Sequence, residues 1–278
     1  MKRAIGAVAV LGVFLSCCLF AQASAEQPLL PDLTGRWITV QHLETYALLP
    51  LIGEIRITTT IALYSDVVQH GATLTLTDAY CFTDVGVSTD LFATDVPDAV
   101  MQSLHSDPRQ AELVADSERI SLIQDWHTEV RGAELDDPVH DPLPISPSDP
   151  RLVDQEGDGE MGITIPVELV GLLSGETYAT QRFRYRLEGN LIDADTITGY
   201  VEWTTEQSLV GATDALFFMP YTQYTDPDPE KHRFVMMRVD EAWDCETART
   251  ALDALLGTLY GLPDPGHPEI AGETPAAP

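Results

Sequence analysis

The feature that most constrains the fold is an alternation of side-chain character with a period of two. Over residues 55–63, isoleucine or leucine stands at every second position except Thr59, with arginine, threonine or alanine between them. A second alternating run, with Phe183, Tyr185 and Leu187 on one side, covers residues 177–187. Successive side chains of a β-strand point to opposite faces, so both runs predict strands of a sheet with two different faces.

The rest of the chain follows the same pattern. A turn at 69–72 and renewed alternation over 73–77 make the first run a hairpin. Further strands are predicted over 33–40, 119–131, 162–167, 196–203, 207–211, 216–221 and 233–239, a turn at 188–190, and short helices over 97–104 and 109–115. Residues 244–260 predict one amphipathic helix, which Gly261 and Pro263 end. We expect a mostly β protein: one barrel-like or sandwich domain of antiparallel strands with a C-terminal helix.

A faint internal repeat relates the two alternating runs. Gly53-Glu54, a strand, a turn and Thr73 are repeated by Gly175-Glu176, a strand, a turn and Thr196, at an offset of 122 and then 123 residues. Such a repeat is typical of two related half-barrels. The β-rich domain, 33–260, would then contain halves 33–131 and 166–260. A proline- and aspartate-rich connection, 132–153, and an acidic loop, 154–165, would join them.

The N-terminus has the features of a secretory signal peptide. Lys2 and Arg3 precede an apolar run over 4–20, and small residues occupy Ala23-Ser24-Ala25 before Glu26. We expect cleavage after Ala25, a linker over 26–32, a flexible tail over 261–278, and no transmembrane segment in the mature chain. The predicted location is periplasmic or extracellular. The alternative is a lipid anchor on Cys17 or Cys18.

Two cysteines, Cys81 and Cys245, remain after cleavage. An exported chain with two distant cysteines most simply forms one disulfide between them. The alternative is two separate buried thiols.

The net charge limits the class of partner. The chain has 44 acidic and 15 basic residues, a formal charge of −29. Such a field repels the phosphate backbone of nucleic acids and attracts divalent cations. We therefore expect no nucleic-acid partner. The charge is equally consistent with a role in solubility alone.

One acidic segment has the spacing of a cation-binding loop. Asp154, Glu156 and Asp158 stand at its first, third and fifth positions and Gly159 at its sixth. Hard cations such as Ca²⁺ prefer several oxygen ligands in a flexible cage. The segment resembles the calcium loops of EF-hands, which implies side-chain ligands from the three acidic residues and a carbonyl ligand from Glu160.

This segment departs from the EF-hand pattern at two positions. Glu156 is longer than the usual aspartate or asparagine, and Ile165 stands where a bidentate glutamate is expected. A strand follows the loop where an EF-hand has a helix, so other residues would have to complete the cage. The alternative is an acidic surface turn that binds nothing.

The first predicted strand begins with Gly35-Arg36-Trp37. This is similar to the Gly-x-Trp entry of lipocalins, in which the tryptophan plugs one end of a barrel. The resemblance implies a carrier of a small apolar ligand. Trp37 can equally be an ordinary core aromatic.

Catalytic signatures are absent from the sequence. Its seven histidines show no zinc spacing, and it has no nucleophile elbow, P-loop or dinucleotide-binding motif. We therefore expect a non-enzymatic protein of the cell envelope or extracellular space with a structural Ca²⁺ loop. A lipocalin-like carrier is the first alternative, and a hydrolase with an unrecognised site is the second.

Overall fold

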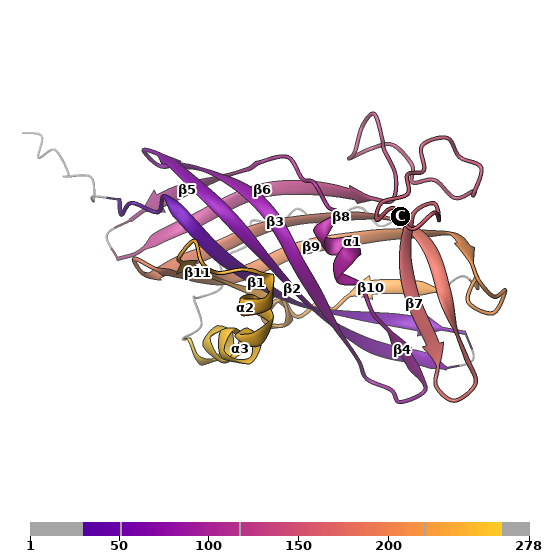
Figure 1. The fold of residues 1–278 in the computed structure, drawn as a ribbon. Coiled ribbons are helices and arrows are strands. Elements are labelled where there is room, and N and C mark those ends of the chain that lie inside the picture. The colour runs from indigo at the N-terminus through magenta and orange to yellow at the C-terminus, as the bar shows by residue number, and fades with distance from the viewer. Residues whose placement is uncertain (1–29, 51, 117, 220, 263–278) are drawn as a thin grey trace, which may run out of the picture.

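The computed structural model describes residues 30–50, 52–116, 118–219 and 221–262, and shows a mostly β fold (Figure 1). Within these ranges an antiparallel sheet contains 11 strands. They are β1 (Gly35–Leu49), β2 (Gly53–His70), β3 (Thr73–Val87), β4 (Phe92–Thr94), β5 (Arg109–Ala115), β6 (Ile120–Arg131), β7 (Ile163–Leu169), β8 (Leu173–Asp193), β9 (Thr196–Ala212), β10 (Thr222–Thr225) and β11 (Arg233–Val239). The helices are α1 (Asp98–Gln102), α2 (Cys245–Thr250), α3 (Leu252–Gly261) and a 3₁₀ turn, η1 (Pro229–Lys231).

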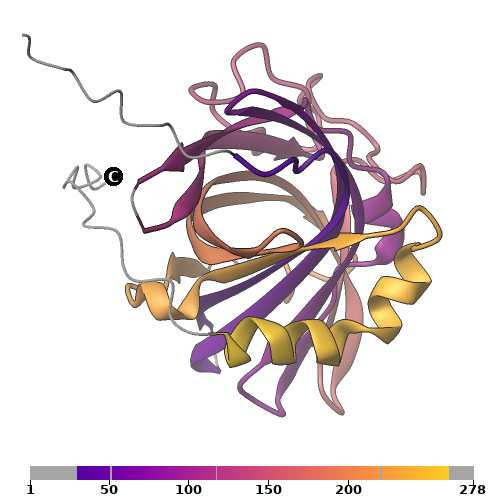
Figure 2. The same cartoon turned by 90° about the vertical axis from the view of Figure 1, so that its left-hand side faces the viewer.

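The sheet closes into a ring. Its neighbour order is β1-β2-β3-β5-β6-β8-β9-β11, and β11 pairs with β1 again. Figure 2 shows this ring end-on. The two hairpins that the sequence suggests are related, β2–β3 and β8–β9, lie on opposite sides of the ring with two strands between them on each side. The expected barrel-like antiparallel fold is confirmed.

The two ends of the barrel are built from different short strands. Along one edge of β8, residues 181–190 pair with β6 and residues 173–179 pair with β7. On the opposite wall, residues 36–42 of β1 pair with β11 and residues 45–48 pair with β10. We call these the β6 end and the β7 end; they lie at the left and right of Figure 1.

Large apolar side chains fill the β6 end. Trp37 is fully buried there, its Nε1 donates to the Leu33 carbonyl at 2.9 Å, and the Arg238 guanidinium lies 4.7 Å from the centre of its ring. Phe183 packs against both Tyr185 and Trp203. Each fully buried side chain of this size contributes about 2–3 kcal/mol to the free energy of unfolding.

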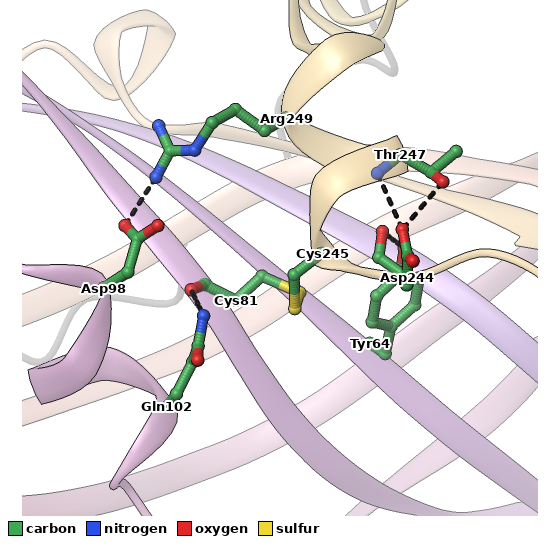
Figure 3. The surroundings of a disulfide bond; sticks show 8 residues. All are labelled: Tyr64, Cys81, Asp98, Gln102, Asp244, Cys245, Thr247 and Arg249. Carbon is green, nitrogen blue, oxygen red and sulfur yellow. Dashed lines mark hydrogen bonds and ion pairs between the residues drawn. A yellow bond between two sulfur atoms is a disulfide. The ribbon is translucent and has the colours of Figure 1, made fainter.

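The C-terminal helices cover the outside of the barrel (Figure 2). Ala248, Leu255 and Leu259 pack on outward-facing side chains of β1, β2, β3 and β11. The predicted disulfide is confirmed: Cys81 on β3 and Cys245 at the start of α2 are bonded, with their Cα atoms 5.1 Å apart (Figure 3).

This disulfide joins positions 164 residues apart. In the loop-entropy description, closing a loop of that length stabilises the fold by about 5 kcal/mol. Two polar contacts beside the disulfide also join α2 to the rest of the fold (Figure 3). The Tyr64 hydroxyl donates to the Asp244 carbonyl, and Arg249 pairs with Asp98 of α1. The helices are therefore fixed to the barrel wall covalently and by hydrogen bonds.

Two expectations at the β6 end are wrong. Residues 109–115 form strand β5 and not a helix; Arg109, Ala111 and Leu113 are buried while the residues between them are exposed. Residues 188–190 are not a turn but the interior of β8. A side chain at Gly189 would meet the Phe234 ring at 2.6 Å, so this glycine permits close packing instead of chain reversal.

Two further expectations need correction near the C-terminus. The apolar run at 216–221 is a loop in its described residues, and the strand follows it as β10. The helix expected over 244–260 is divided at Ala251 into α2 and α3.

Several predictions lie outside the described residues. These are the signal peptide over 1–25, with Cys17 and Cys18, residues 26–29 of the linker, and residues 263–278 of the tail. Among the described residues, no helix combines the length and apolar character needed to cross a membrane.

Candidate functional site

The β7 end of the barrel contains a partly open cavity of about 240 Å³. Nine strands (β1 to β4 and β6 to β10), helix α1 and the loops before β2, α1 and β10 all contribute to its wall. Its lining is largely apolar and includes Ile57, Ile61, Val85, Phe92, Ile165, Val167, Leu209 and Phe217. Because most of these side chains are branched aliphatics that present no hydrogen-bonding group, this space suits apolar matter better than water.

A chain of polar side chains crosses the barrel beside this cavity. Arg131 is its centre: one guanidinium nitrogen donates to Gln181 Oε1 at 2.9 Å and another to Glu129 Oε2 at 3.1 Å. The Tyr80 hydroxyl also donates to Glu129. On the other side, Gln181 donates to Gln207 at 3.3 Å, and Gln207 donates to the Tyr221 hydroxyl at 2.7 Å. We call these six residues the polar floor.

The polar floor lies at the point along β8 where the neighbouring strand changes from β6 to β7. Arg131 is the last residue of β6 and pairs with Gln181, while β7 takes up pairing at Ala179. Gly132 and Gly162 cross here: a Cβ on Gly132 would lie 2.8 Å from the Gly162 backbone, and both have positive φ. Since only glycine fits this approach, the chain can leave the barrel at Gly132 and return at Gly162.

A second buried polar group lies deeper, towards the β6 end. Arg109 is fully buried and donates to Asp78, Gln124 and Ser65. A buried ion pair of this kind is tolerable only with its remaining hydrogen bonds made, and the pair is satisfied in this way. The charges of Arg109 and Asp78 therefore cancel within the barrel.

Glu129 is the perturbed acid of the site. Burial raises the pKa of its carboxyl to about 7, although Arg131 acts in the opposite direction. Burial also lowers the pKa of the neighbouring His127, whose Nε2 lies 3.9 Å from Glu129. Three buried polar atoms near this carboxyl have no hydrogen-bond partner among the described residues: His127 Nε2, Tyr185 Oη and Arg131 Nε.

The acidic loop stands outside the barrel wall. Asp154 accepts backbone N–H groups from Gly157, Asp158 and Gly159 at 2.8–3.0 Å, so its carboxylate organises the turn. A parallel bridge between Asp154 and Gly162 closes the loop.

The next two acidic residues converge on one residue. Glu156 accepts the Thr164 backbone N–H at 2.5 Å, and Asp158 accepts the Thr164 hydroxyl at 2.7 Å. Glu156 Oε2 is buried, and no described residue forms a hydrogen bond with it. Burial raises the pKa of the Glu156 carboxyl, and the charge of Asp158 adds to this effect. Glu160 is exposed and donates its backbone N–H to Asp158.

The described part of the chain contains no group of three or more acidic, histidine or cysteine side chains already gathered for a metal ion. The structure brings the Glu156 and Asp158 carboxylates to a common partner, Thr164, whereas the Asp154 carboxylate accepts backbone N–H groups of the turn.

The acidic loop is attached to the barrel where the pairing along β8 passes from β6 to β7. The Gly132 N–H donates to the Gln155 side chain, and the Val153 N–H donates to the Gly132 carbonyl.

Comparison with models of known protein families, with curated proteins and with solved structures gives no match. The site must therefore be interpreted from its own chemistry.

Sequence reasoning did not predict the polar floor, nor which end of the barrel holds a cavity. One signal was present: Glu129 and Arg131 stand two positions apart on a strand, so they share a face. Their polarity hid the fact that this face points inward.

We expect Glu129 to make the stability of the fold depend on pH. A carboxyl with a raised pKa in the folded chain stabilises at low pH, and this contribution is lost as the pH rises through the folded pKa. Here the loss falls between pH 4.5 and about 7 and amounts to roughly 3 kcal/mol. Urea denaturation of wild type and Glu129→Gln at pH 5, 6, 7 and 8 measures it. The variant should show the flatter profile; identical pH slopes would contradict the assignment.

Proposed function

We propose that the protein is an exported, non-enzymatic carrier that holds a small apolar ligand inside the β7 end of its barrel. The observation that supports this proposal is the cavity of about 240 Å³ between β2, β3, β7 and β9. Among the described residues, the β6 end of the same barrel is filled by buried aliphatic and aromatic side chains.

The size of the cavity limits the ligand. A cavity of about 150 Å³ lined by apolar side chains stays dry and binds benzene. By proportion, 240 Å³ holds roughly ten non-hydrogen atoms. The ligand, or the part of it that is enclosed, is therefore small.

Exposed apolar side chains lie in the loops next to the cavity. Leu91 and Leu172 are 62% and 86% exposed, and Val170 and Phe218 are about half exposed. Leu91 and Val170 are hydrogen-bonded neighbours, and the adjoining residues Phe92, Leu169 and Phe217 line the cavity. An apolar rim at this end favours the transfer of an apolar ligand from a donor surface.

Export is supported by the N-terminal signal sequence and by the disulfide, since structural disulfides persist in oxidising compartments.

We expect the cavity to bind 1-octanol, and Val85→Trp to weaken this binding at least tenfold, because the indole would occupy the space. Isothermal titration calorimetry of the full chain measures it. The matched control is Val114→Trp, which places the same side chain on the exposed face of β5. Wild type that binds no octanol, or Val85→Trp that binds it normally, would refute the carrier.

We also propose that the acidic loop binds Ca²⁺ and thereby holds the connection over 132–153 against the barrel. The support is the convergence of Glu156 and Asp158 on Thr164 together with the unpartnered Glu156 Oε2. A buried carboxylate oxygen without a donor is a suitable cation ligand. Asp154 and the Glu160 carbonyl would complete this side of the cage.

We expect 1 mM Ca²⁺ to raise the melting temperature relative to the same sample in chelator, and Asp158→Ala to remove that difference. Asp158→Ala also loses two hydrogen bonds, so the measured quantity is the calcium-dependent difference and not the melting temperature itself. Glu112→Ala, on the exposed face of β5, is the control for lost charge. Equal melting temperatures of wild type with calcium and with chelator would exclude a structural ion.

A further inference from the structure

We infer that the ligand of the cavity is an amphiphile with a carboxylate head, which Arg131 binds at the polar floor while the apolar tail occupies the cavity. This inference rests on the proposed carrier function and specifies its class of ligand.

Arg131 has a hydrogen-bond donor to spare. Its side chain lines the cavity and is 8% exposed. A guanidinium group carries five N–H donors in a planar fork. The terminal nitrogens donate to Gln181 and Glu129, whereas the buried Nε–H finds no acceptor in the part of the chain that the structure describes. A buried donor left unpaired is unfavourable, so a ligand oxygen that accepts from it would be bound more tightly.

Tyr221 provides a second spare donor on the cavity wall. Its hydroxyl oxygen accepts from Gln207, and no acceptor for its proton is found among the described residues. Burial raises the pKa of the hydroxyl to about 12, so it stays protonated at neutral pH. The polar edge of the cavity therefore offers donors, and the complementary ligand group is an acceptor.

The charge balance favours an anionic acceptor over a neutral one. The positive charge of Arg131 is balanced by the Glu129 carboxylate. Burial of Glu129 opposes ionisation of that carboxyl. When Glu129 takes up a proton, Arg131 is left with an uncompensated charge at the cavity edge. The charged and titratable groups around Glu129 are Asp78 and Tyr80 of β3, Arg109 of β5 (paired with Asp78), His127 and Arg131 of β6, and Tyr185 of β8.

A bound carboxylate and an ionised Glu129 repel each other, so the ligand binds best when Glu129 is protonated. Affinity for a carboxylate should therefore fall as the pH rises. With a pKa of about 7, the protonated fraction of Glu129 falls about tenfold between pH 6 and pH 8. An alcohol of the same length has no such dependence.

The test compares octanoate, which has about ten non-hydrogen atoms, with 1-octanol, by calorimetry on the full chain at pH 6 and pH 8. We expect octanoate to bind at least tenfold more tightly than octanol at pH 6, and about tenfold more weakly at pH 8 than at pH 6. Glu129→Gln should keep tight octanoate binding and lose its pH dependence.

The double variant Glu129→Gln/Arg131→Met removes the cation without leaving a buried carboxylate unpaired. The measured quantity is the ratio of the two affinities. This variant should lose the preference for octanoate over octanol, and octanol binding of any strength shows that the barrel is still folded. Octanol binding with equal or weaker octanoate binding at pH 6 overturns the inference and leaves the carrier function standing. So does octanoate binding that is unchanged in the double variant or independent of pH in wild type. If neither compound binds, the carrier function itself fails.

Discussion

The fold depends on one strand with three partners. One edge of β8 pairs with β9 along nearly its whole length. The other edge pairs with β6 over one part of the strand and with β7 over the rest. Every backbone group in a sheet needs a partner, so when β6 ends at Arg131 another strand must continue the wall. The chain supplies it as β7 after an excursion of about thirty residues over the outside. This division separates a barrel end filled by side chains from an end that is hollow.

The polar floor follows from the same division. Arg131 and Gln181 meet where the wall changes strands, and their side chains point inward across the barrel. A buried guanidinium is costly unless it is paired, and Glu129 with Tyr80 supplies that pairing from the β6 side. The floor thus separates the aromatic core from the cavity and gives the cavity one polar edge. The acidic loop returns to the barrel at Gly162, beside this division, so a cation held there would act on the same strand junction.

The parts of the fold that were predictable are those encoded locally. Alternation identified the β2–β3 hairpin and the strands over 177–187 and 196–203 that form parts of β8 and β9. The pair of distant cysteines identified the disulfide. The failures depend on contacts between distant segments. Residues 109–115 were predicted as a helix because Arg109 is charged and would be expected at the surface. Its side chain is buried in the strand because its partner, Asp78, comes from another strand. Gly189 resembled a turn because the ring of Phe234, which requires it, arrives from β11. The cavity has no local signature, since its wall comes from nine strands, a helix and three loops.

Xenon provides the most direct test of a barrel that is packed at one end and hollow at the other, because it enters apolar cavities without needing any polar contact. A crystal structure determined under xenon pressure should show the gas between Val85, Val167 and Leu209. It should show none among Trp37, Phe183 and Trp203. Side chains collapsed into the β7 end, with no xenon there, would contradict the division of the barrel on which the proposed function rests.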